Sequence, residues 1–141
     1  MSVEAFLDTN VLVYAAAGSG EEAVKRRLAL RLIDELDFGL SAQVLQEFYV
    51  TVVHKIPVPL SAAEALEWIE QLEAFPCQAI EPSLVKIGAE LSQRYRISYW
   101  DGAVIAAAGA LGARTLFSED LNHDQLYGQV RVVNPFLATV G

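Results

Sequence analysis

Four acidic residues of this chain stand where a fold could bring their carboxylates together. Asp8 directly follows a short apolar run, and Asp120 comes three residues after Phe117, which ends another such run. Asp101 lies in the first turn of an expected helix, and Glu47 lies in the middle of one. Carboxylates held close together repel one another and raise each other's pKa unless cations offset the charge. An all-oxygen ligand set suits Mg²⁺ or Mn²⁺ rather than zinc, and such ions can activate water for phosphodiester cleavage.

Each of these acids also has a purely structural interpretation. Asp8 can cap the helix that follows it, as Asp residues commonly do. Asp101 can be the acidic partner of Ser98 in a capping box, and Asp120 can be a solvated loop residue. Glu47 lies beside the apolar stripe of its helix, so periodicity alone favours a solvated side chain. The case for chemistry therefore depends on the set of four and not on any single member.

Short apolar runs alternate with helical patterns along the chain. The runs at 3–7, 38–40, 77–80, 115–117 and 130–133 predict strands. Apolar periodicity, capping residues and prolines predict helices at 10–17, 21–36, 41–54, 61–75, 83–95 and 98–111. This alternation is typical of an α/β fold with a mostly parallel sheet of about four to five short strands. Because the carboxyl ends of such strands meet at one edge, Asp8 and Asp120 are expected there, where ligands bind.

Composition narrows the class of protein. The 141 residues are 53% hydrophobic and carry a net charge of −8, which predicts one globular domain spanning residues 1–141. That charge argues against non-specific coating of nucleic acid, since phosphates would be repelled. A single cysteine, Cys77, excludes a disulfide within the chain. With no basic leader and no apolar stretch of membrane-spanning length, we expect a cytoplasmic protein without membrane partners.

Five segments, taken in order, resemble the PIN-domain ribonucleases and above all the VapC toxins of bacterial toxin–antitoxin pairs. They are FLDTNVL at 6–12, QEF at 46–48, SYWD at 98–101, FSEDLNH at 117–123 and VVNPF at 132–136. The resemblance extends over nearly the whole chain. It implies a PIN-like three-layer fold, with a central parallel sheet and helices on both faces, and a Mg²⁺- or Mn²⁺-dependent ribonuclease.

The resemblance also implies roles for individual residues and partners. The acidic, metal-binding and catalytic pocket would consist of Asp8, Glu47, Asp101 and Asp120. The hydrogen-bonding residues that orient it would be Thr9, Asn10 and Ser118. The family further implies a homodimer, an RNA substrate and an antitoxin protein, a segment of which blocks the pocket, often with a basic side chain.

Two positions depart from the pattern of close relatives. Asp124 stands where Gly often follows the histidine, which adds a carboxylate near the expected pocket. Gly102 follows Asp101 where Ala is commoner, and this weakens the helix by something under ~1 kcal/mol. Neither departure removes a residue of the expected acidic pocket.

Basic and aromatic residues suggest how RNA would be held. Arg94, Arg96 and Arg114 flank the helix that bears Asp101 and are candidate phosphate contacts. Tyr99, Trp100 and Trp68 are candidates for base stacking, although the helical spacing of Trp68 favours a core position. Glu21 and Lys25 are spaced for an i,i+4 ion pair.

Two other functions stay open from the sequence. The chain could be a catalytically silent binding module whose carboxylates dock an arginine of a partner. It could also be a phosphatase with Asp8 as nucleophile. That chemistry needs an aspartate two residues after the nucleophile, and position 10 is Asn10. It also needs a lysine near the later acids, and the last lysine of the chain is Lys86.

Overall fold

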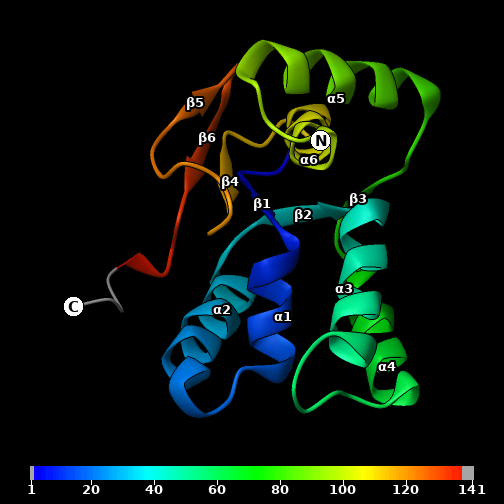
Figure 1. The fold of residues 1–141 in the computed structure, drawn as a ribbon, viewed down its shortest axis with the longest axis vertical. Coiled ribbons are helices and arrows are strands. Elements are labelled where there is room, and N and C mark those ends of the chain that lie inside the picture. Colours follow the sequence, from blue (N-terminus) through cyan, green and yellow to red (C-terminus); the bar gives the residue numbers. More distant parts are fainter. Residues whose placement is uncertain (1, 138–141) are drawn as a thin grey trace.

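The computed structural model describes residues 2–137, whose strands form one six-stranded sheet (Figure 1). The strands are β1 (Ala5–Leu7), β2 (Phe38–Ser41), β3 (Cys77–Gln78), β4 (Thr115–Phe117), β5 (Leu126–Tyr127) and β6 (Val130–Val133). They lie in the order β3-β2-β1-β4-β6-β5, and only β5 runs antiparallel to its neighbour. The mostly parallel sheet is confirmed, with six strands in place of the four to five expected. β5 is too short, at two residues, to give a periodic signal.

Within residues 2–137, six α-helices cover the two faces of this sheet. They are α1 (Thr9–Ala17), α2 (Ala23–Glu35), α3 (Ala42–His54), α4 (Ala62–Leu72), α5 (Pro82–Tyr95) and α6 (Tyr99–Ala110). In Figure 1, α5 and α6 lie on one side of the sheet and α1 to α4 lie on the other. A short 3₁₀ turn, η1 (Gly20–Glu22), precedes α2, so the helix expected from residue 21 begins at Ala23. The three-layer arrangement is thus the one that the resemblance to PIN domains implies.

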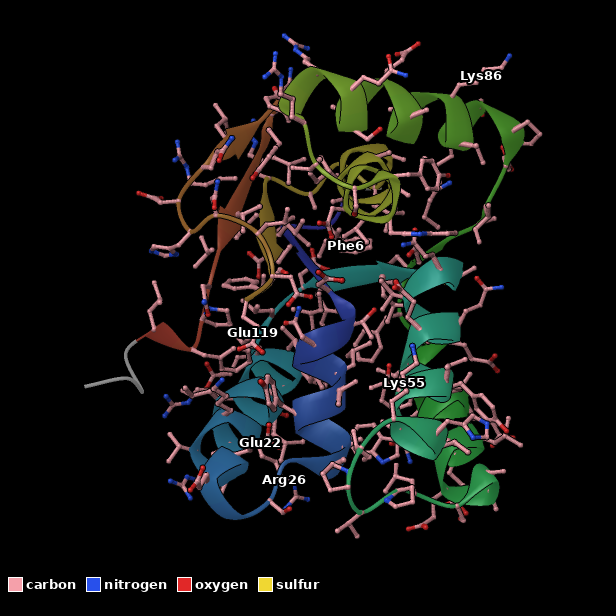
Figure 2. The ribbon with its side chains drawn as sticks, viewed as in Figure 1. Phe6, Glu22, Arg26, Lys55, Lys86 and Glu119 are labelled. Carbon is pink, nitrogen blue, oxygen red and sulfur yellow. The ribbon has the colours of Figure 1, made fainter. Side chains whose placement is uncertain are left out.

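The central strands are buried because helices cover both their faces. All three residues of β1 are buried, with Phe6 completely enclosed at the middle of the sheet (Figure 2). Leu116 of β4 and Leu40 of β2 are enclosed in the same core. Continuous apolar strands are what a parallel sheet covered on both sides requires. No helix among residues 2–137 is long and apolar enough to cross a bilayer.

Two glycines let α5 and α6 approach closely. A Cβ atom at Gly102 would lie 2.4 Å from the backbone oxygen of Gly88, and one at Gly88 would lie 3.0 Å from the Cα of Ala103. An alanine at position 102 would therefore collide with the backbone of α5. The glycine that lowers the intrinsic stability of α6 is needed for the packing that fixes the helix bearing Asp101.

Candidate active site

Asp8 lies at the carboxyl end of β1 and also caps α1. Its Oδ1 accepts a hydrogen bond from the backbone N–H of Thr9 at 2.7 Å, and its Oδ2 accepts one from Ser118 Oγ at 2.7 Å. The side chain is 5% exposed. The capping role, which the sequence left open, and the expected place at the carboxyl edge of the sheet are both observed. Each carboxylate oxygen is thus held in a fixed direction.

Ser118 and Asn10 connect the loop after β4 to the start of α1. Ser118 is fully buried, and its Oγ accepts hydrogen bonds from Asn10 Nδ2 at 3.2 Å and from the backbone N–H of Asp120 at 3.1 Å. Asn10 Nδ2 also donates to Asp120 Oδ2 at 3.1 Å, and Asn10 Oδ1 accepts from the backbone N–H of Glu119 at 3.3 Å. These bonds place the exposed carboxylate of Asp120 beside that of Asp8.

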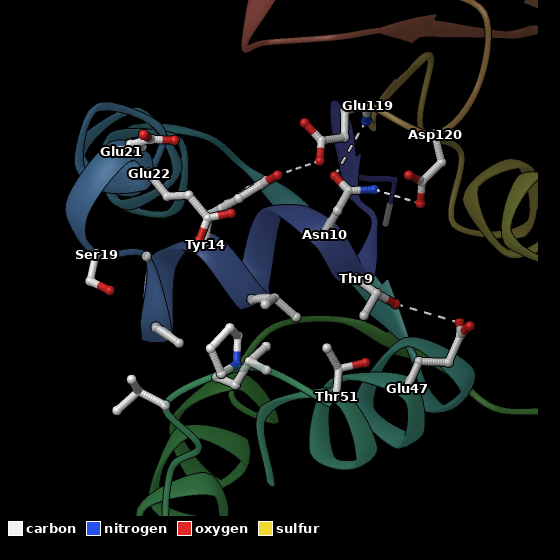
Figure 3. A pocket seen from close by; sticks show the side chains of 16 residues that line it. Thr9, Asn10, Tyr14, Ser19, Glu21, Glu22, Glu47, Thr51, Glu119 and Asp120 are labelled. Carbon is white, nitrogen blue, oxygen red and sulfur yellow. Dashed lines mark hydrogen bonds between the residues drawn. The ribbon is translucent and has the colours of Figure 1, made fainter. Parts of the chain in front are cut away.

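Glu47 faces this edge of the sheet from α3. Its Oε1 accepts a hydrogen bond from Thr9 Oγ1 at 3.4 Å (Figure 3). The same oxygen accepts a second hydrogen bond from Gln43 Nε2 at 3.2 Å. The side chain is half-buried, whereas its position on the helix favoured a solvated one. The expectation of solvation is wrong because the neighbouring helix α1 supplies a partner, which helical periodicity cannot show.

Gln43 is a residue of the site that sequence reasoning missed. It is 8% exposed, and its Nε2 donates both to Glu47 and to the backbone oxygen of Trp100 at 3.2 Å. One amide group therefore connects α3 to the first turn of α6. The i,i+4 spacing of Gln43 and Glu47 is the signal that could have suggested it.

Asp101 lies in the first turn of α6, opposite Glu47. Its backbone N–H donates to Ser98 Oγ at 3.1 Å, so Ser98 caps the helix as expected. Within residues 2–137 the Asp101 carboxylate does not accept a reciprocal hydrogen bond from the Ser98 backbone N–H, so the capping box expected here is incomplete, unlike the one at Ser61 and Glu64. The Ser98 hydroxyl also stabilises the charged form of the Asp101 carboxylate, which works against the rise in its pKa.

The four carboxylates act on one another electrostatically. Burial raises the pKa of Asp8 to about 7, with the charges of Asp120 and Glu47 adding to the effect against the hydrogen bonds from Ser118 and Thr9. Burial likewise raises the pKa of Glu47, and the charges of Asp101 and Asp120 raise it further.

Asp101 and Asp120 also interact with each other. Burial raises the pKa of Asp101, and the charge of Asp120 contributes in the same direction. Within residues 2–137 no lysine, arginine or histidine forms an ion pair with Asp8, Glu47, Asp101 or Asp120. The site therefore has four interacting acids without a basic counter-ion.

A groove of about 690 Å³ extends from these acids along α1 (Figure 3). Thr9, Asn10, Glu47 and Asp120 line one end of it. Its charged lining residues within the described part of the chain are all acidic, and they are Glu21, Glu22, Glu47, Glu119 and Asp120. Apolar side chains from α1 and from the segment after α3 form the wall between them. The groove thus combines an apolar wall with a strongly negative rim.

One carboxylate beside the groove is neutralised. Glu119 accepts a hydrogen bond from the Tyr14 hydroxyl, and its Oε2 lies 3.1 Å from Lys25 Nζ. Lys25 Nζ also lies 4.8 Å from the centre of the Tyr14 ring. Lys25 was expected to pair with Glu21, and the pairing with Glu119 replaces it because α2 packs beside the loop after β4. Lys25, which lies beside the groove, is therefore already engaged by Glu119.

The donor chemistry of the site fits a hard divalent cation, because carboxylate, hydroxyl and amide oxygens are what Mg²⁺ and Mn²⁺ bind. Within residues 2–137, however, no group of three or more His, Cys, Asp or Glu side chains is already close enough to hold an ion. The hydrogen bonds from Ser118, Thr9 and Asn10 instead occupy oxygens of Asp8 and Asp120. The residue types therefore suit a divalent metal ion, but the carboxylates would have to move closer to one another to bind it.

Other residues singled out from the sequence lie outside this cluster. Arg114 directly precedes β4, at the opposite edge of the sheet from Asp120. Arg94 and Arg96 lie at the carboxyl end of α5, with Arg94 over the ring of Tyr95. None of these three lines the groove.

Asp124 also has a local role. Its backbone has a left-handed conformation, with φ of 68°, and its Oδ1 lies 3.4 Å from Arg131 Nη1. It does not line the groove. The extra carboxylate that distinguishes this chain from the expected pattern is thus paired within the turn before β5.

Comparison with known proteins identifies the fold family. The sequence profile of the PIN domain matches residues 5–129. The chain belongs to the PIN domain family. A comparison with curated proteins finds no match.

Solved structures share the fold of this PIN domain. A toxin–antitoxin complex from Klebsiella pneumoniae is 18% identical with a TM-score of 0.70, over 94% of this chain and 98% of that one. VapC20 of Mycobacterium tuberculosis, described as a sarcin-ricin loop cleaving toxin, is 17% identical with a TM-score of 0.63, over 83% and 92%. VapBC2 of Rickettsia felis, bound to a promoter DNA fragment, is 16% identical with a TM-score of 0.62, over 92% and 97%. The PIN domain described above therefore has the architecture of VapC toxins.

Proposed function

We propose that the protein is a Mg²⁺- or Mn²⁺-dependent endoribonuclease and the toxin of a toxin–antitoxin pair. The observation that carries this proposal is a set of four electrostatically linked carboxylates at the carboxyl edge of the sheet, which have no basic counter-ion within residues 2–137; they belong to Asp8, Glu47, Asp101 and Asp120. Membership of the PIN family and the similarity to a toxin described as cleaving the sarcin-ricin loop support it. Uncompensated carboxylates cost stability, and binding cations is the function that offsets the cost.

The roles of the residues follow from their contacts. The four carboxylates would hold the metal, which when bound polarises a scissile phosphate and lowers the pKa of water. Ser118 and the backbone N–H of Thr9 fix the two oxygens of Asp8, so the carboxylate keeps one orientation. Asn10 does the same for Asp120. Thr9, Asn10 and Ser118 are in this proposal positioning residues.

The groove suggests how an antitoxin would act. Its apolar wall and acidic rim suit a peptide with apolar side chains and a lysine or arginine, which would approach the carboxylates from the α1 side. The similar structures that contain an antitoxin support such a partner. A homodimer, location in the cytoplasm and RNA contacts by Arg94, Arg96 and Arg114 belong to the same proposal.

The experiment is cleavage of total cellular RNA at low salt, with Mg²⁺ or Mn²⁺ compared with EDTA. Low salt is needed because rising ionic strength weakens the contacts of lysine and arginine side chains with RNA phosphates. Discrete bands that need metal and are absent for Asp8→Asn would support the proposal. Asp124→Asn is the matched control, since it removes an acid outside the cluster at a position where Asn tolerates the left-handed backbone. Equal cleavage by wild type and Asp8→Asn would contradict the assigned site.

One observation favours a second function, that of a catalytically silent binding module. The absence of a ready group of three ligands within residues 2–137 is compatible with carboxylates that dock an arginine of a partner and not a metal. In that case the protein would bind a basic peptide with affinity that depends on Asp8 and Asp120, while no RNA would be cleaved under any metal condition.

A further inference from the structure

A second depression adjoins the carboxylates on the side away from α1. It has a volume of about 330 Å³, and Glu47, Thr51, Lys55 and Trp100 are among its lining residues. Glu47 and Thr51 also line the acidic groove, so the two depressions meet beside the carboxylate cluster. A chain bound at the cluster can therefore extend from it in two directions, into the groove or into this depression.

Trp100 gives the second depression an exposed aromatic surface. The side chain is 62% exposed, which is unusual for an indole, and it directly precedes Asp101. Its ring meets Tyr99 edge-on, with centroids 5.1 Å apart and planes at 76°. Gln43, buried in α3, holds the backbone oxygen of Trp100. The backbone of Trp100 is thus held by Gln43 and its indole contacts Tyr99, while much of the indole surface is free to receive another planar group.

Lys55 supplies a positive charge to the same depression. It caps the carboxyl end of α3 and is exposed, and its ammonium group forms no ion pair or hydrogen bond with any residue in the described range 2–137. Figure 2 shows Lys55 beside α3, whereas Lys86 lies at the far side of the molecule on α5. This lysine contrasts with the acidic groove, where Lys25 is already paired with Glu119.

We propose that Trp100 and Lys55 form a nucleotide-binding subsite for single-stranded RNA next to the carboxylate cluster. The base stacks on the indole of Trp100, and the ammonium group of Lys55 contacts a phosphate. The inference rests on the proposed ribonuclease function and adds the direction in which the substrate lies.

Charge favours RNA here over a protein partner. The acidic groove repels phosphates, so the RNA strand has one favourable side of the cluster and it is the side with Lys55. An aromatic face with a nearby cation is the usual combination for binding a single strand. A second copy of this chain would also cover an exposed indole, and the test below separates the two occupants.

The first test measures binding without cleavage. In a full-length Asp8→Asn, Trp68→Phe variant, Trp100 is the only tryptophan, and its fluorescence reports directly on the subsite. Octa-adenylate should quench this fluorescence, whereas an abasic strand with the same number of phosphates should not. Trp100→Ala should weaken octa-adenylate binding about tenfold or more, measured by anisotropy of a labelled strand, because one base–aromatic stack is lost. Trp100→Phe should restore most of the affinity.

Matched controls test the specificity of each effect. Leu66 is an exposed apolar residue of α4 that lines neither depression, and Leu66→Ala should leave the affinity unchanged. Lys55→Gln should weaken binding and lower the slope of log affinity against log salt by about one, as expected for one lost phosphate contact. Lys86→Gln should change neither quantity beyond the general effect of one charge.

Three results would overturn the inference. One is equal affinity of Trp100→Ala and the parent for octa-adenylate, and another is equal quenching by the abasic strand. The third is a Trp100→Ala protein whose sedimentation shows loss of a dimer with no change in RNA affinity, which would assign the surface to a second copy. In the active chain, Trp100→Ala should raise KM with little change in kcat. Octa-adenylate binding without any RNA cleavage would refute the ribonuclease function and leave the subsite intact.

Discussion

Glu119 and Asp120 are neighbours on the loop after β4, and the fold treats their charges in opposite ways. Glu119 is bonded to the Tyr14 hydroxyl and paired with Lys25, so its charge is balanced. The Asp120 carboxylate accepts one hydrogen bond from the neutral Asn10 side chain and interacts with three other acids. The charge of Glu119 is therefore balanced by a lysine, whereas Asp120, the next residue, lies in a strongly negative environment.

The contrast shows that only the carboxylate cluster lacks a basic partner, while the neighbouring Glu119 has one. The fold places a lysine beside Glu119, within one residue of Asp120, and still leaves the cluster without one. The hydrogen bonds around Asp8 and Glu47 orient the carboxylates and offset only part of the cost of burying them. A site kept in this costly state is suited to a ligand that brings positive charge.

The largest expected effect is a difference in RNA cleavage rate between variants of a carboxylate in the cluster and of the ion-paired carboxylate of Glu119. Asp101→Asn should lower the rate of RNA cleavage by more than about a hundredfold, as expected for loss of a group that acts on the reacting phosphate. Glu119→Gln should keep the rate within about threefold, because its carboxylate is already engaged. The measurement is initial cleavage rate at fixed Mg²⁺, with melting curves to show that both variants are folded. Equal losses for the two variants would remove the distinction.

The second effect is on stability and depends on pH. In EDTA, the pKa of Asp8 is about 7 in the folded protein against an ordinary value of 3.8, so the folded state binds more protons between these values. The free energy of unfolding should therefore fall as pH rises from about 4 to about 8, by at most about 4 kcal/mol from Asp8. Urea unfolding of wild type and Asp8→Asn across this range isolates the contribution of Asp8.

The Asp8→Asn variant, whose side chain carries no charge, is the control for this prediction. Asp8→Asn should become more stable than wild type above neutral pH while losing activity, since it removes the buried charge. Mg²⁺ should stabilise wild type at high pH and stabilise Asp8→Asn much less, because the ion binds the deprotonated carboxylate. An unfolding free energy difference that does not vary with pH would contradict the raised pKa.

A smaller effect concerns Gln43, which joins Glu47 to the first turn of α6. Gln43→Ala should reduce cleavage about ten- to a hundredfold through loss of orientation, the usual consequence of removing a group that supports a metal-binding residue. The reduction should be greater at low Mg²⁺ than at saturating Mg²⁺, which a purely structural defect would not produce. Gln71→Ala, on the exposed face of α4, is the matched control.

The smallest expected effect is on the free energy of unfolding, when the ion pair between Lys25 and Glu119 is removed. Lys25→Met removes the ion pair with Glu119, and both side chains are about a quarter exposed, so solvent screens the pair. We expect a loss of about 1 kcal/mol or less in the free energy of unfolding, measured in urea at two salt concentrations. Loss of cleavage on the scale of Asp101→Asn would mean that Lys25 acts in the site and that the two regions are not distinct.

Local rules were enough to predict the edge of the sheet and the caps. Asp8 follows a buried strand and caps the next helix, and Ser98 caps α6, because both features depend on a few consecutive residues. The mostly parallel sheet followed from the alternation of strands and helices. Placement of the four acids as one set, by contrast, came from the resemblance to PIN domains and not from periodicity.

Contacts between distant segments could not be predicted in this way. Glu47 is drawn to Thr9 of another helix, and Lys25 bonds to Glu119 and not to its helical neighbour Glu21. Gly102 looks unfavourable for its own helix until the backbone of Gly88 is placed against it. In each case tertiary packing decides the result, and propensity and spacing describe only one of the two partners.

The bond between Ser118 and Asp8 joins residues 110 positions apart, since β1 at the centre of the sheet pairs with the late strand β4. A growing chain exposes Asp8 early in synthesis, but the strand and loop that complete its surroundings are made near the end. Such long-range pairing forms slowly and only after loop closure. The carboxylate cluster is therefore assembled after most of the polypeptide has left the ribosome, and a truncated translation product that ends before β4 lacks Asp120 and cannot complete it.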